Sequence, residues 1–231
     1  MATLAANSPL SNLADILHAA IALSPDAWQG TGSRGDGASR GSSNLTDDLK
    51  ELFALLQQRK TAHVLVGGVA LLRYVDGRNT QDIDLLISLE SLQRVPEIVI
   101  ADRNKEFARA RFKSLAVDLL LTVNPLFKLV AEKYATVHPF AEIPVPCATV
   151  EGLILLKLYA LPSLYRQGDG QRIGLYETDI FLLCQRHNPN IANLMETLRQ
   201  FVGETDFQEL TNIAADIQRR ITRVDSAKKQ P

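Results

Sequence analysis

The hydrophobic pattern of this chain has two periods, which divide it into predicted helices and strands. Apolar residues recur at three- and four-residue spacing, as in helices with one buried face, at 13–21, 46–60, 125–134, 191–202 and 206–224. Runs that alternate or are apolar throughout, as in strands, lie at 64–66, 83–88, 107–112 and 115–123, and the pattern is strand-like from Ile98. A short helix is expected at 70–74. The segment 153–161 is apolar all round except for Lys157, which predicts a buried helix.

A stretch near the N-terminus interrupts this pattern. Residues 29–43 are rich in Gly, Ser and Arg, which predicts a linker that does not order itself, with order resuming at Thr46. Gly30-x-Gly32-x-x-Gly35 matches a dinucleotide-binding fingerprint, and residues 34–36 match a cell-adhesion tripeptide. No strand precedes the glycines and no helix follows them at once, so both matches are interpreted as accidents of composition.

Further breaks lie in the second half of the chain. Prolines punctuate 139–152, which predicts a connection between domains with a boundary near 144–149. A polar loop is expected at 163–174, before a helix at 178–187 with Asp179 as an N-terminal cap. The tail at 226–231 is expected to be disordered.

Composition excludes several classes of protein. The net charge is −1, so nucleic acid would have to bind at a local basic patch rather than to a basic surface overall. The N-terminus lacks the basic start of a secretory signal, and no apolar run is long enough to cross a bilayer. Cys147 and Cys184 show no metal-binding spacing and are expected to be reduced, partly buried thiols. These features predict a cytoplasmic protein that does not contact a membrane.

The stretch from His63 to Ser88 holds the first candidate chemistry. Asp82 and Asp84 lie two residues apart on a predicted strand, so their side chains share one face. Side by side they repel, and a cation between them would stabilise them. Gly67 and Gly68, upstream, form a turn whose backbone N–H groups can approach a phosphate. Metal plus phosphate is the hypothesis that these residues favour.

Two isolated charges in apolar segments extend this hypothesis. Asp118 is the sole charge in its predicted strand, where it is either a third metal ligand beside Asp82 and Asp84 or the partner of a neighbouring arginine. Lys157, on its buried helix, must either extend to the surface or meet an anion.

These residues resemble a known family. The segments that carry the resemblance are Val66-Gly67-Gly68-Val69-Ala70-Leu71, Arg78-x-Thr80-x-Asp82-Ile83-Asp84-Leu85, Val117-Asp118-Leu119 and Glu151-Gly152-Leu153-Ile154 through Lys157-Leu158-x-Ala160. Together they resemble the nucleotidyltransferases of the DNA polymerase β superfamily, and within it the AbiEii-type toxins and the minimal nucleotidyltransferases. The resemblance covers roughly residues 60–185.

The resemblance implies a fold and a domain organisation. The fold class would be α/β (α+β), with a small mixed sheet as the nucleotidyltransferase core, flanking helices and a C-terminal helical domain. The division would be 1–45 for an N-terminal helix and flexible linker, 46–147 for the core, 148–225 for the helical domain and 226–231 for the tail.

The resemblance also implies transfer of a nucleoside monophosphate from an NTP such as ATP to an acceptor hydroxyl, with two Mg²⁺ ions. Asp82, Asp84 and Asp118 would be the catalytic metal ligands. The nucleotide would be bound by Gly67, Gly68, Arg78, Thr80 and Lys157.

The chain departs from the family pattern at two places. Val69 stands where many members have a hydroxyl, which removes a side-chain donor to phosphate. The family commonly has a basic residue shortly before the downstream aspartate, where this chain has Leu175-Tyr176-Glu177-Thr178. Asp179 is the residue that falls at that aspartate, and Arg166 or Arg172 is expected to supply the missing charge.

Three alternatives remain open for the role of the chain. The acceptor would be RNA, such as a tRNA 3′ end, if the chain acts like a toxin, and a strip of basic residues, Lys105, Arg109, Arg111 and Lys113, offers a contact for a phosphate backbone. It would be a partner protein if the chain acts like an antitoxin-type nucleotidyltransferase. A toxin–antitoxin system would also supply a cognate partner. The last alternative is a catalytically silent nucleotide-binding or interaction module.

Overall fold

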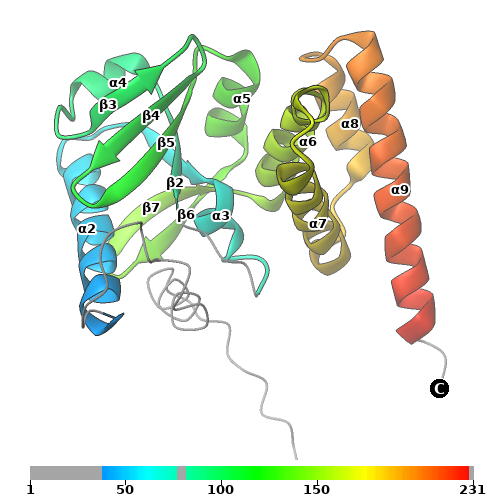
Figure 1. Ribbon diagram of the computed structural model, residues 1–231, viewed down its shortest axis with the longest axis horizontal. Coiled ribbons are helices and arrows are strands. Elements are labelled where there is room, and N and C mark those ends of the chain that lie inside the picture. Colours follow the sequence, from blue (N-terminus) through cyan, green and yellow to red (C-terminus); the bar gives the residue numbers. More distant parts are fainter. Residues whose placement is uncertain (1–37, 77–81, 229–231) are drawn as a thin grey trace, which may run out of the picture.

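The computed structural model describes residues 38–76 and 82–228 of the chain. Within them a seven-stranded mixed sheet with its helices forms one half of the molecule, and helices alone form the other (Figure 1). The strands are β1 (His63–Val66), β2 (Ile83–Ile87), β3 (Val99–Arg103), β4 (Phe107–Phe112), β5 (Leu115–Leu121), β6 (Ala135–Phe140) and β7 (Ile143–Ala148). The expected fold class, a mixed sheet flanked by helices and followed by C-terminal helices, is confirmed.

The sheet places β2 at its centre, in the order β3-β4-β5-β2-β1-β7-β6. β2 is antiparallel to β1 and parallel to β5, and β4 is antiparallel to β5. On β2 the predicted face of Ile83, Leu85 and Ile87 is buried, but Leu86 on the opposite face is buried too, so within the strand only Asp84 is partly exposed. The predicted alternation holds on β4, where Ala108, Ala110 and Phe112 are buried and the residues between them are exposed. Polar side chains can therefore lie on the solvent-facing side of the inner strands, and not only at the edges of the sheet.

Helix α2 (Ala38–Gln58) packs its apolar residues against the sheet. The predicted face of Leu49, Leu52, Phe53 and Leu56 is fully buried, and the Phe53 ring meets the Phe140 ring edge-on at 5.0 Å. The helix begins at Ala38, so the expectation of a linker to residue 43 and of order from Thr46 was wrong for 38–45. A helix that is already anchored by tertiary packing can extend at low cost, because each further residue adds a hydrogen bond without a new nucleus.

The diglycine starts a helix rather than a loop. α3 (Gly67–Leu71) follows β1 directly, three residues earlier than the helix expected at 70–74, and residues 72–74 form turns. Gly67 has φ +63°, a left-handed conformation that a residue with a side chain rarely adopts. This residue lets the chain turn from strand to helix without a connecting loop.

The proline-rich stretch expected to connect two domains is instead a β-hairpin. β6 and β7 pair from Ala135–Ala148 to Phe140–Ile143, and Ala141, at φ +52°, lies in the turn. A proline has no N–H to donate, so prolines are tolerated where a strand lies at an edge. β6 is an edge strand, and β7 pairs with β1 only at Leu65–Cys147, beyond its prolines.

Short helices accompany the sheet. α4 (Leu89–Gln93) was not predicted, and its N-cap is Ser88, whose hydroxyl accepts a hydrogen bond from the Ser91 N–H at 3.0 Å. α5 (Pro125–Lys133) follows β5 and begins at Asn124, whose side chain accepts from the backbone N–H groups of residues 126 and 127.

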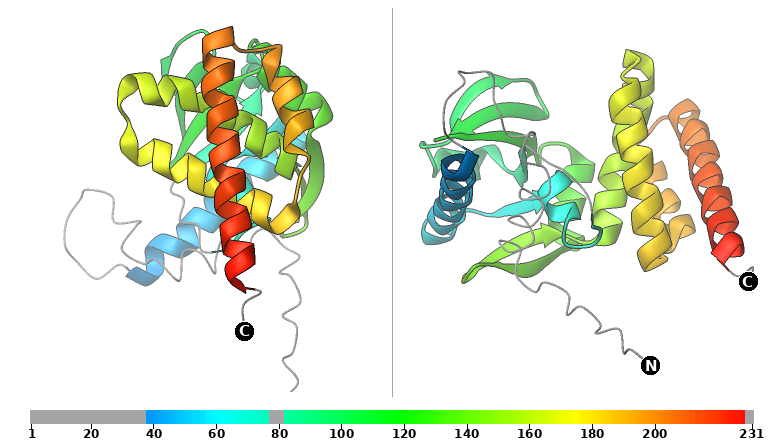
Figure 2. Two further views of the ribbon diagram at one scale, coloured as in Figure 1. Left: turned by 90° about the vertical axis from the view of Figure 1, so that its right-hand side faces the viewer. Right: turned by 60° about the horizontal axis from the view of Figure 1, so that its bottom comes forward.

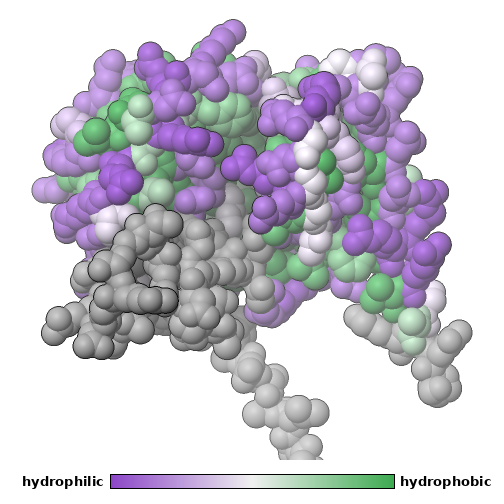
Figure 3. Space-filling model, in the orientation of Figure 1, coloured by the Kyte–Doolittle hydropathy of each residue, from purple (hydrophilic) through white to green (hydrophobic). Residues whose placement is uncertain are grey.

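Four helices form the second half, α6 (Val150–Gln167), α7 (Gly170–His187), α8 (Ile191–Arg199) and α9 (Glu204–Lys228). The right-hand view of Figure 2 shows them standing beside the sheet half, and Figure 3 shows that the outer surface of both halves is mostly hydrophilic on this face. The loop expected at 163–174 was wrong, because α6 continues through Pro162 to Gln167. Only Gly168, at φ +69°, and Asp169 separate α6 from α7.

Two further expectations in this half were wrong. Asp179 was expected as a cap, but α7 begins at Gly170 with Asp169 as its N-cap, so Asp179 lies in mid-helix. The tail was expected to be disordered from 226, but α9 reaches Lys228.

Several expectations lie outside the described residues. These are the helix at 13–21, the glycine and tripeptide matches at 30–36, Arg78, Thr80, and residues 229–231. Among the described helices, none is both long and apolar enough to cross a membrane.

Candidate active site

Two of the three expected aspartates lie side by side at the centre of the sheet. Asp84 on β2 is in register with Asp118 on the parallel strand β5, and on its other side Asp84 is opposite Val66, the last residue of β1. Asp82 precedes the first residue of β2 and is exposed. The turn into α3 therefore begins beside Asp84, and the structure brings the diglycine and this pair of carboxylates together.

The carboxylates of this cluster oppose one another's ionisation. The pKa of Asp84 is raised to about 7, first because the group is buried and next because of the Asp118 carboxylate. Asp82 raises it further, whereas Lys157 and a hydrogen bond from the Gly68 N–H lower it. The fold thus holds negative groups together at a cost that a nearby cation would offset.

Asp118 experiences both signs of charge. Its pKa is raised overall, first by burial and next by the Asp82 carboxylate. Arg109 and Arg172 partly oppose this rise. Arg109 is the residue directly opposite Asp118 on β4. Arg172 comes from the first turn of α7, so the helical half contributes charge to this part of the sheet. Both roles weighed for Asp118, arginine neighbour and metal ligand, are compatible with this placement.

The three aspartates suit a hard divalent cation by their chemistry. Carboxylate oxygens are the ligands that Mg²⁺ prefers, and mutual repulsion makes a shared cation favourable. In the described part of the chain, no three His, Cys, Asp or Glu side chains are arranged as a ready-made metal cluster. The donor set fits Mg²⁺, and the side chains would turn toward an ion that they share.

Lys157 is buried and acts electrostatically on this cluster. The side chain on α6 is only 7% exposed, and its Nζ lies 2.8 Å from Oδ2 of Asp179 and 4.3 Å from the centre of the Tyr176 ring. Its charge also lowers the pKa of Asp84. The anion that Lys157 meets within the chain is therefore Asp179, a pairing that the sequence analysis missed. The sequence did contain a pattern that predicts this pairing, because Lys157 and Asp179 are each the single charge on an apolar helix face.

The two candidate arginines lie in different surroundings. Arg166 on α6 donates to Asp206 on α9 at 2.7 Å, within the helical half. Arg172 is exposed, lies 3.7 Å from Asp169 and acts on the pKa of Asp118. Of the two, the structure brings Arg172 to the aspartates.

An aromatic cluster adjoins the aspartates and was also missed. Phe107 faces the same side of β4 as Arg109 and is 44% exposed. Its ring packs edge-on against Phe127 at 5.3 Å, and Phe127 packs against Tyr159 at 5.9 Å. The Tyr159 hydroxyl is held by Asn124, the cap of α5. One side of the Phe107 ring is thus fixed by packing while the other side meets solvent.

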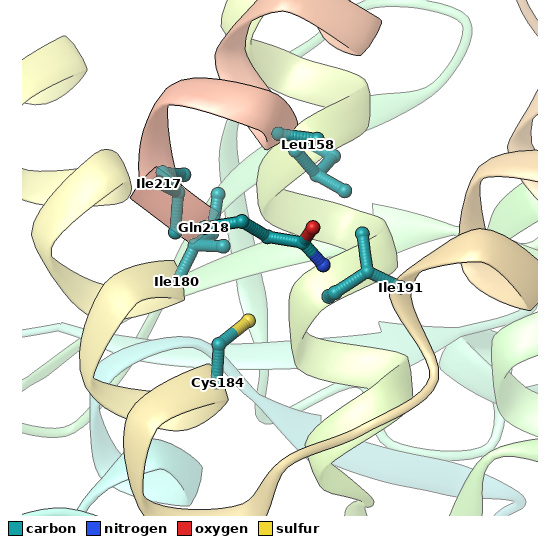
Figure 4. Close-up of a pocket in the computed structure, with 7 residues that line it drawn as sticks. Leu158, Ile180, Cys184, Ile191, Ile217 and Gln218 are labelled. Carbon is teal, nitrogen blue, oxygen red and sulfur yellow. The ribbon is translucent and has the colours of Figure 1, made fainter. Parts of the chain in front are cut away.

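Two cavities among the described residues lie away from the aspartates. Leu158, Ile180, Cys184 and Ile191 help to line a cavity of about 10 Å³ inside the helical half, and Figure 4 shows their side chains around it. It is barely large enough for one water molecule. A surface pocket of about 780 Å³ lies between the end of α2, α5 and the β6–β7 hairpin, and none of the three aspartates lines it.

Comparison with known proteins supports the fold. No protein-family model and no curated protein sequence matches the chain. The crystal structure of ANT(2″)-Ia in complex with adenylyl-2″-tobramycin is similar, with a TM-score of 0.52 and 16% identity over 72% of this chain and 98% of that chain. The chain has the fold of a nucleotidyltransferase.

Two other solved structures are similar at lower scores. One is an antigenic nucleotidyltransferase-like protein from Paracoccidioides brasiliensis, with a TM-score of 0.47 and 16% identity over 80% of this chain and 94% of that chain. The other is the solution structure of ANT(2″)-Ia, with a TM-score of 0.48 and 15% identity over 81% and 99% of the two chains.

Proposed function

We propose that this chain transfers a nucleoside monophosphate from an NTP to an acceptor hydroxyl and releases pyrophosphate. The observation that carries the proposal is the pair Asp84 and Asp118, in register on parallel central strands with Asp82 close enough to raise the pKa of both. Nucleotidyl transfer needs this arrangement, because negative side chains must hold cations against a polyphosphate. The nucleotidyltransferase fold supports the same reaction.

The three aspartates act through the metal that they would bind. Asp82, Asp84 and Asp118 would hold Mg²⁺, with Asp82 and Asp84 acting toward the triphosphate and Asp118 toward the acceptor. Bound Mg²⁺ neutralises phosphate charge and lowers the pKa of the attacking hydroxyl. The acceptor oxygen bonds to the α-phosphorus as the bond from that phosphorus to the bridging oxygen breaks. The leaving pyrophosphate takes the electron pair of that bond, and the proton of the acceptor hydroxyl passes to solvent water.

Nearby groups bind and orient the nucleotide. The backbone N–H group of Gly67 is a phosphate donor that compensates for the missing hydroxyl at Val69, and the Gly68 N–H, which donates to Asp84, holds that metal ligand beside the phosphate site. Lys157 supplies a buried positive charge, balanced by Asp179 when no phosphate is present. Arg78 and Thr80 remain proposed nucleotide contacts. Such catalysis depends mainly on positioning and on electrostatic stabilisation.

We propose the end of an RNA strand as the acceptor. Phe107 offers an exposed ring on which a base can stack, and Arg109, on the same face of β4, lies directly opposite Asp118. Arg111 continues this basic face, as does the exposed Lys105, whereas Lys113 is engaged by Glu51. An aromatic platform beside cations is the usual combination for single-stranded nucleic acid. A toxin-like role, through modification of a tRNA 3′ end, belongs to this proposal.

The reaction is tested by incubating the protein with α-labelled NTPs, Mg²⁺ and separate acceptors, namely a tRNA pool, protein extract and tobramycin. We expect labelled tRNA with wild type, and none with Asp84→Asn or when EDTA is added. Asp216→Asn, on the exposed face of α9, is the matched control and should label like wild type. Equal labelling by wild type and Asp84→Asn would overturn the enzyme proposal. Labelled protein or tobramycin in place of tRNA would overturn the acceptor assignment alone.

The acceptor surface has its own test. Phe107→Ala should raise the KM for RNA roughly five- to a hundredfold, because stacking on an aromatic ring contributes about 1–3 kcal/mol per base. The KM for the NTP should not change, and Phe107→Tyr should retain most of the affinity. Val137→Ala, which shortens an exposed apolar side chain on β6, is the control. An unchanged KM for RNA in Phe107→Ala would exclude the stacking platform.

The cellular role is tested by induced expression. A toxin arrests growth, and Asp84→Asn should relieve the arrest. Expression of wild type without arrest would argue against the toxin-like role and leave the chemistry to the labelling experiment.

A further inference from the structure

Asp84 occupies the space that a side chain at Gly67 would need. The glycine at this position therefore affects Asp84 as well as the proposed phosphate contact. A Cβ placed on Gly67 would lie 1.8 Å from Oδ2 of Asp84, 2.3 Å from its Cγ and 2.7 Å from its Cβ. Contacts below 3.0 Å are not tolerated by real Cβ atoms, so one of the two segments would have to move.

Rotation of the Asp84 side chain cannot relieve this contact. The Cβ of Asp84 is fixed by the backbone of β2, and it would still lie 2.7 Å from a Cβ on Gly67 after the rest of the side chain had rotated away. A side chain at Gly67 would therefore displace β1 from β2, which pair at Val66–Asp84. Such a shift would change the position of Asp84 relative to Asp118 on β5.

A second contact joins the same two segments. The Gly68 N–H donates a hydrogen bond to the Asp84 carboxylate. This N–H lies in the first turn of α3, where backbone donors have no partner within the helix, and the N-cap residue Val66 provides no side-chain acceptor. Asp84 therefore serves as the cap that the local sequence lacks.

We propose that Gly67 is a positioning residue for Asp84, and that the absence of its side chain together with the Gly68 N–H sets where this carboxylate lies against Asp118. The effect of Gly67 on metal binding rests on the proposed function. The contact of Gly67 and Gly68 with Asp84 does not depend on it. Mutation of a group that supports a metal ligand typically weakens metal binding by about 10- to 100-fold.

A double-mutant cycle tests the contact by thermal unfolding, with no nucleotide present. Gly67→Ala should lower Tm more than Gly168→Ala, its matched control, because Gly168 has a similar φ of +69° but nothing within 4 Å of an added Cβ. Asp84→Gly removes all three crowded atoms. In that background Gly67→Ala should cost no more than Gly168→Ala. An equal drop in Tm in both backgrounds would overturn the proposal.

Hydrogen exchange tests the contact even if Gly67→Ala does not fold. The Gly68 amide should exchange at least about tenfold faster in Asp84→Gly than in wild type, because the carboxylate that accepts its hydrogen bond is lost. It should be unchanged in Asp118→Asn, which keeps Asp84. Equal exchange in Asp84→Gly and wild type would contradict the hydrogen bond and with it the proposed role of the diglycine.

Binding of Mn²⁺ to nucleotide-free protein, followed by EPR, tests the consequence. Gly67→Ala should bind Mn²⁺ at least about tenfold more weakly than wild type, and Gly168→Ala should bind it like wild type. Equal binding by Gly67→Ala and wild type would overturn the positioning role. If wild type binds no Mn²⁺, the proposed function fails, and the cycle and the exchange rates still decide the contact.

Discussion

Lys157 on α6 and Asp179 on α7 form a buried ion pair, with Nζ 2.8 Å from Oδ2. The pair joins the first two helices of the helical half, and the charge of Lys157 also acts on Asp84 of the sheet. Removing one member of such a pair leaves a buried charge without its partner, which costs more than the pair contributes when it is intact.

We therefore expect Asp179→Asn to lower the free energy of unfolding by about 3 kcal/mol, measured by urea denaturation. The double variant Lys157→Met with Asp179→Leu should recover most of this loss, because it leaves no unpaired charge. Asp206→Asn, which breaks the more exposed Arg166–Asp206 pair, should cost less than about 1 kcal/mol. Similar losses in Asp179→Asn and Asp206→Asn would contradict a buried role for the pair.

The aspartate cluster should destabilise the protein when no metal is present. The pKa of Asp84 is about 7 in the folded protein and 3.8 in its ordinary state, so folding disfavours the charged form. In EDTA, stability should fall as the pH rises from about 4 to 7 and remain low above that range. Asp84→Asn should thus raise the Tm in EDTA at pH 8 by several degrees, roughly 2–4 °C for each kcal/mol relieved.

Mg²⁺ provides the complementary measurement. It should raise the Tm of wild type at pH 8 and have little effect on Asp84→Asn, since the variant lacks both the repulsion and a ligand. Asp216→Asn is the control for a lost carboxylate on the surface. If Asp84→Asn unfolds below wild type in EDTA, the repulsion is not the dominant effect at this site.

Two glycines on helices should respond to alanine with opposite signs. An added Cβ on Gly152 of α6 would lie 2.9 Å from the carbonyl oxygen of Tyr134, whereas Gly174 of α7 has open space around it. Alanine is favoured over glycine in helices by about 1 kcal/mol. Gly174→Ala should therefore raise stability by roughly that amount, and Gly152→Ala should lower it. Stabilisation by both substitutions would show that α6 can move away from Tyr134.

The two thiols should be unreactive in the native protein. Burial raises the pKa of Cys147 and of Cys184 to about 12, so almost no thiolate is present at pH 8. Neither should react with iodoacetamide over an hour in buffer, and both should react in denaturant, as mass spectrometry would detect. Rapid labelling of one cysteine in buffer would indicate that its segment opens locally.

The features that the sequence predicted correctly depend on local pattern. The buried face of Ile83, Leu85 and Ile87, and the buried face of α2, follow from periodicity because each residue needs only its neighbours to define a face. The features it missed depend on partners far along the chain. Lys157 required knowledge that α7 packs on α6, and Gly67 required the position of β2.

The hairpin at 135–148 is a second feature that local sequence could not predict. Its prolines were interpreted as a connection, because a proline in a central strand would remove a sheet hydrogen bond. Whether a strand lies at an edge is a property of the assembled sheet. Pro144 and Pro146 precede the single pairing of β7 with β1, so they leave that pairing intact.

The pairing of Leu65 with Cys147 also bears on how the chain assembles during synthesis. β1 emerges early but needs β2 on one side and β7 on the other, and β7 is made only after most of the sheet. Parallel pairing between distant segments forms slowly, because a long loop must close before any contact compensates for it. One edge of β1 therefore stays open until residue 148 has left the ribosome, and fragments that end earlier should be prone to aggregation.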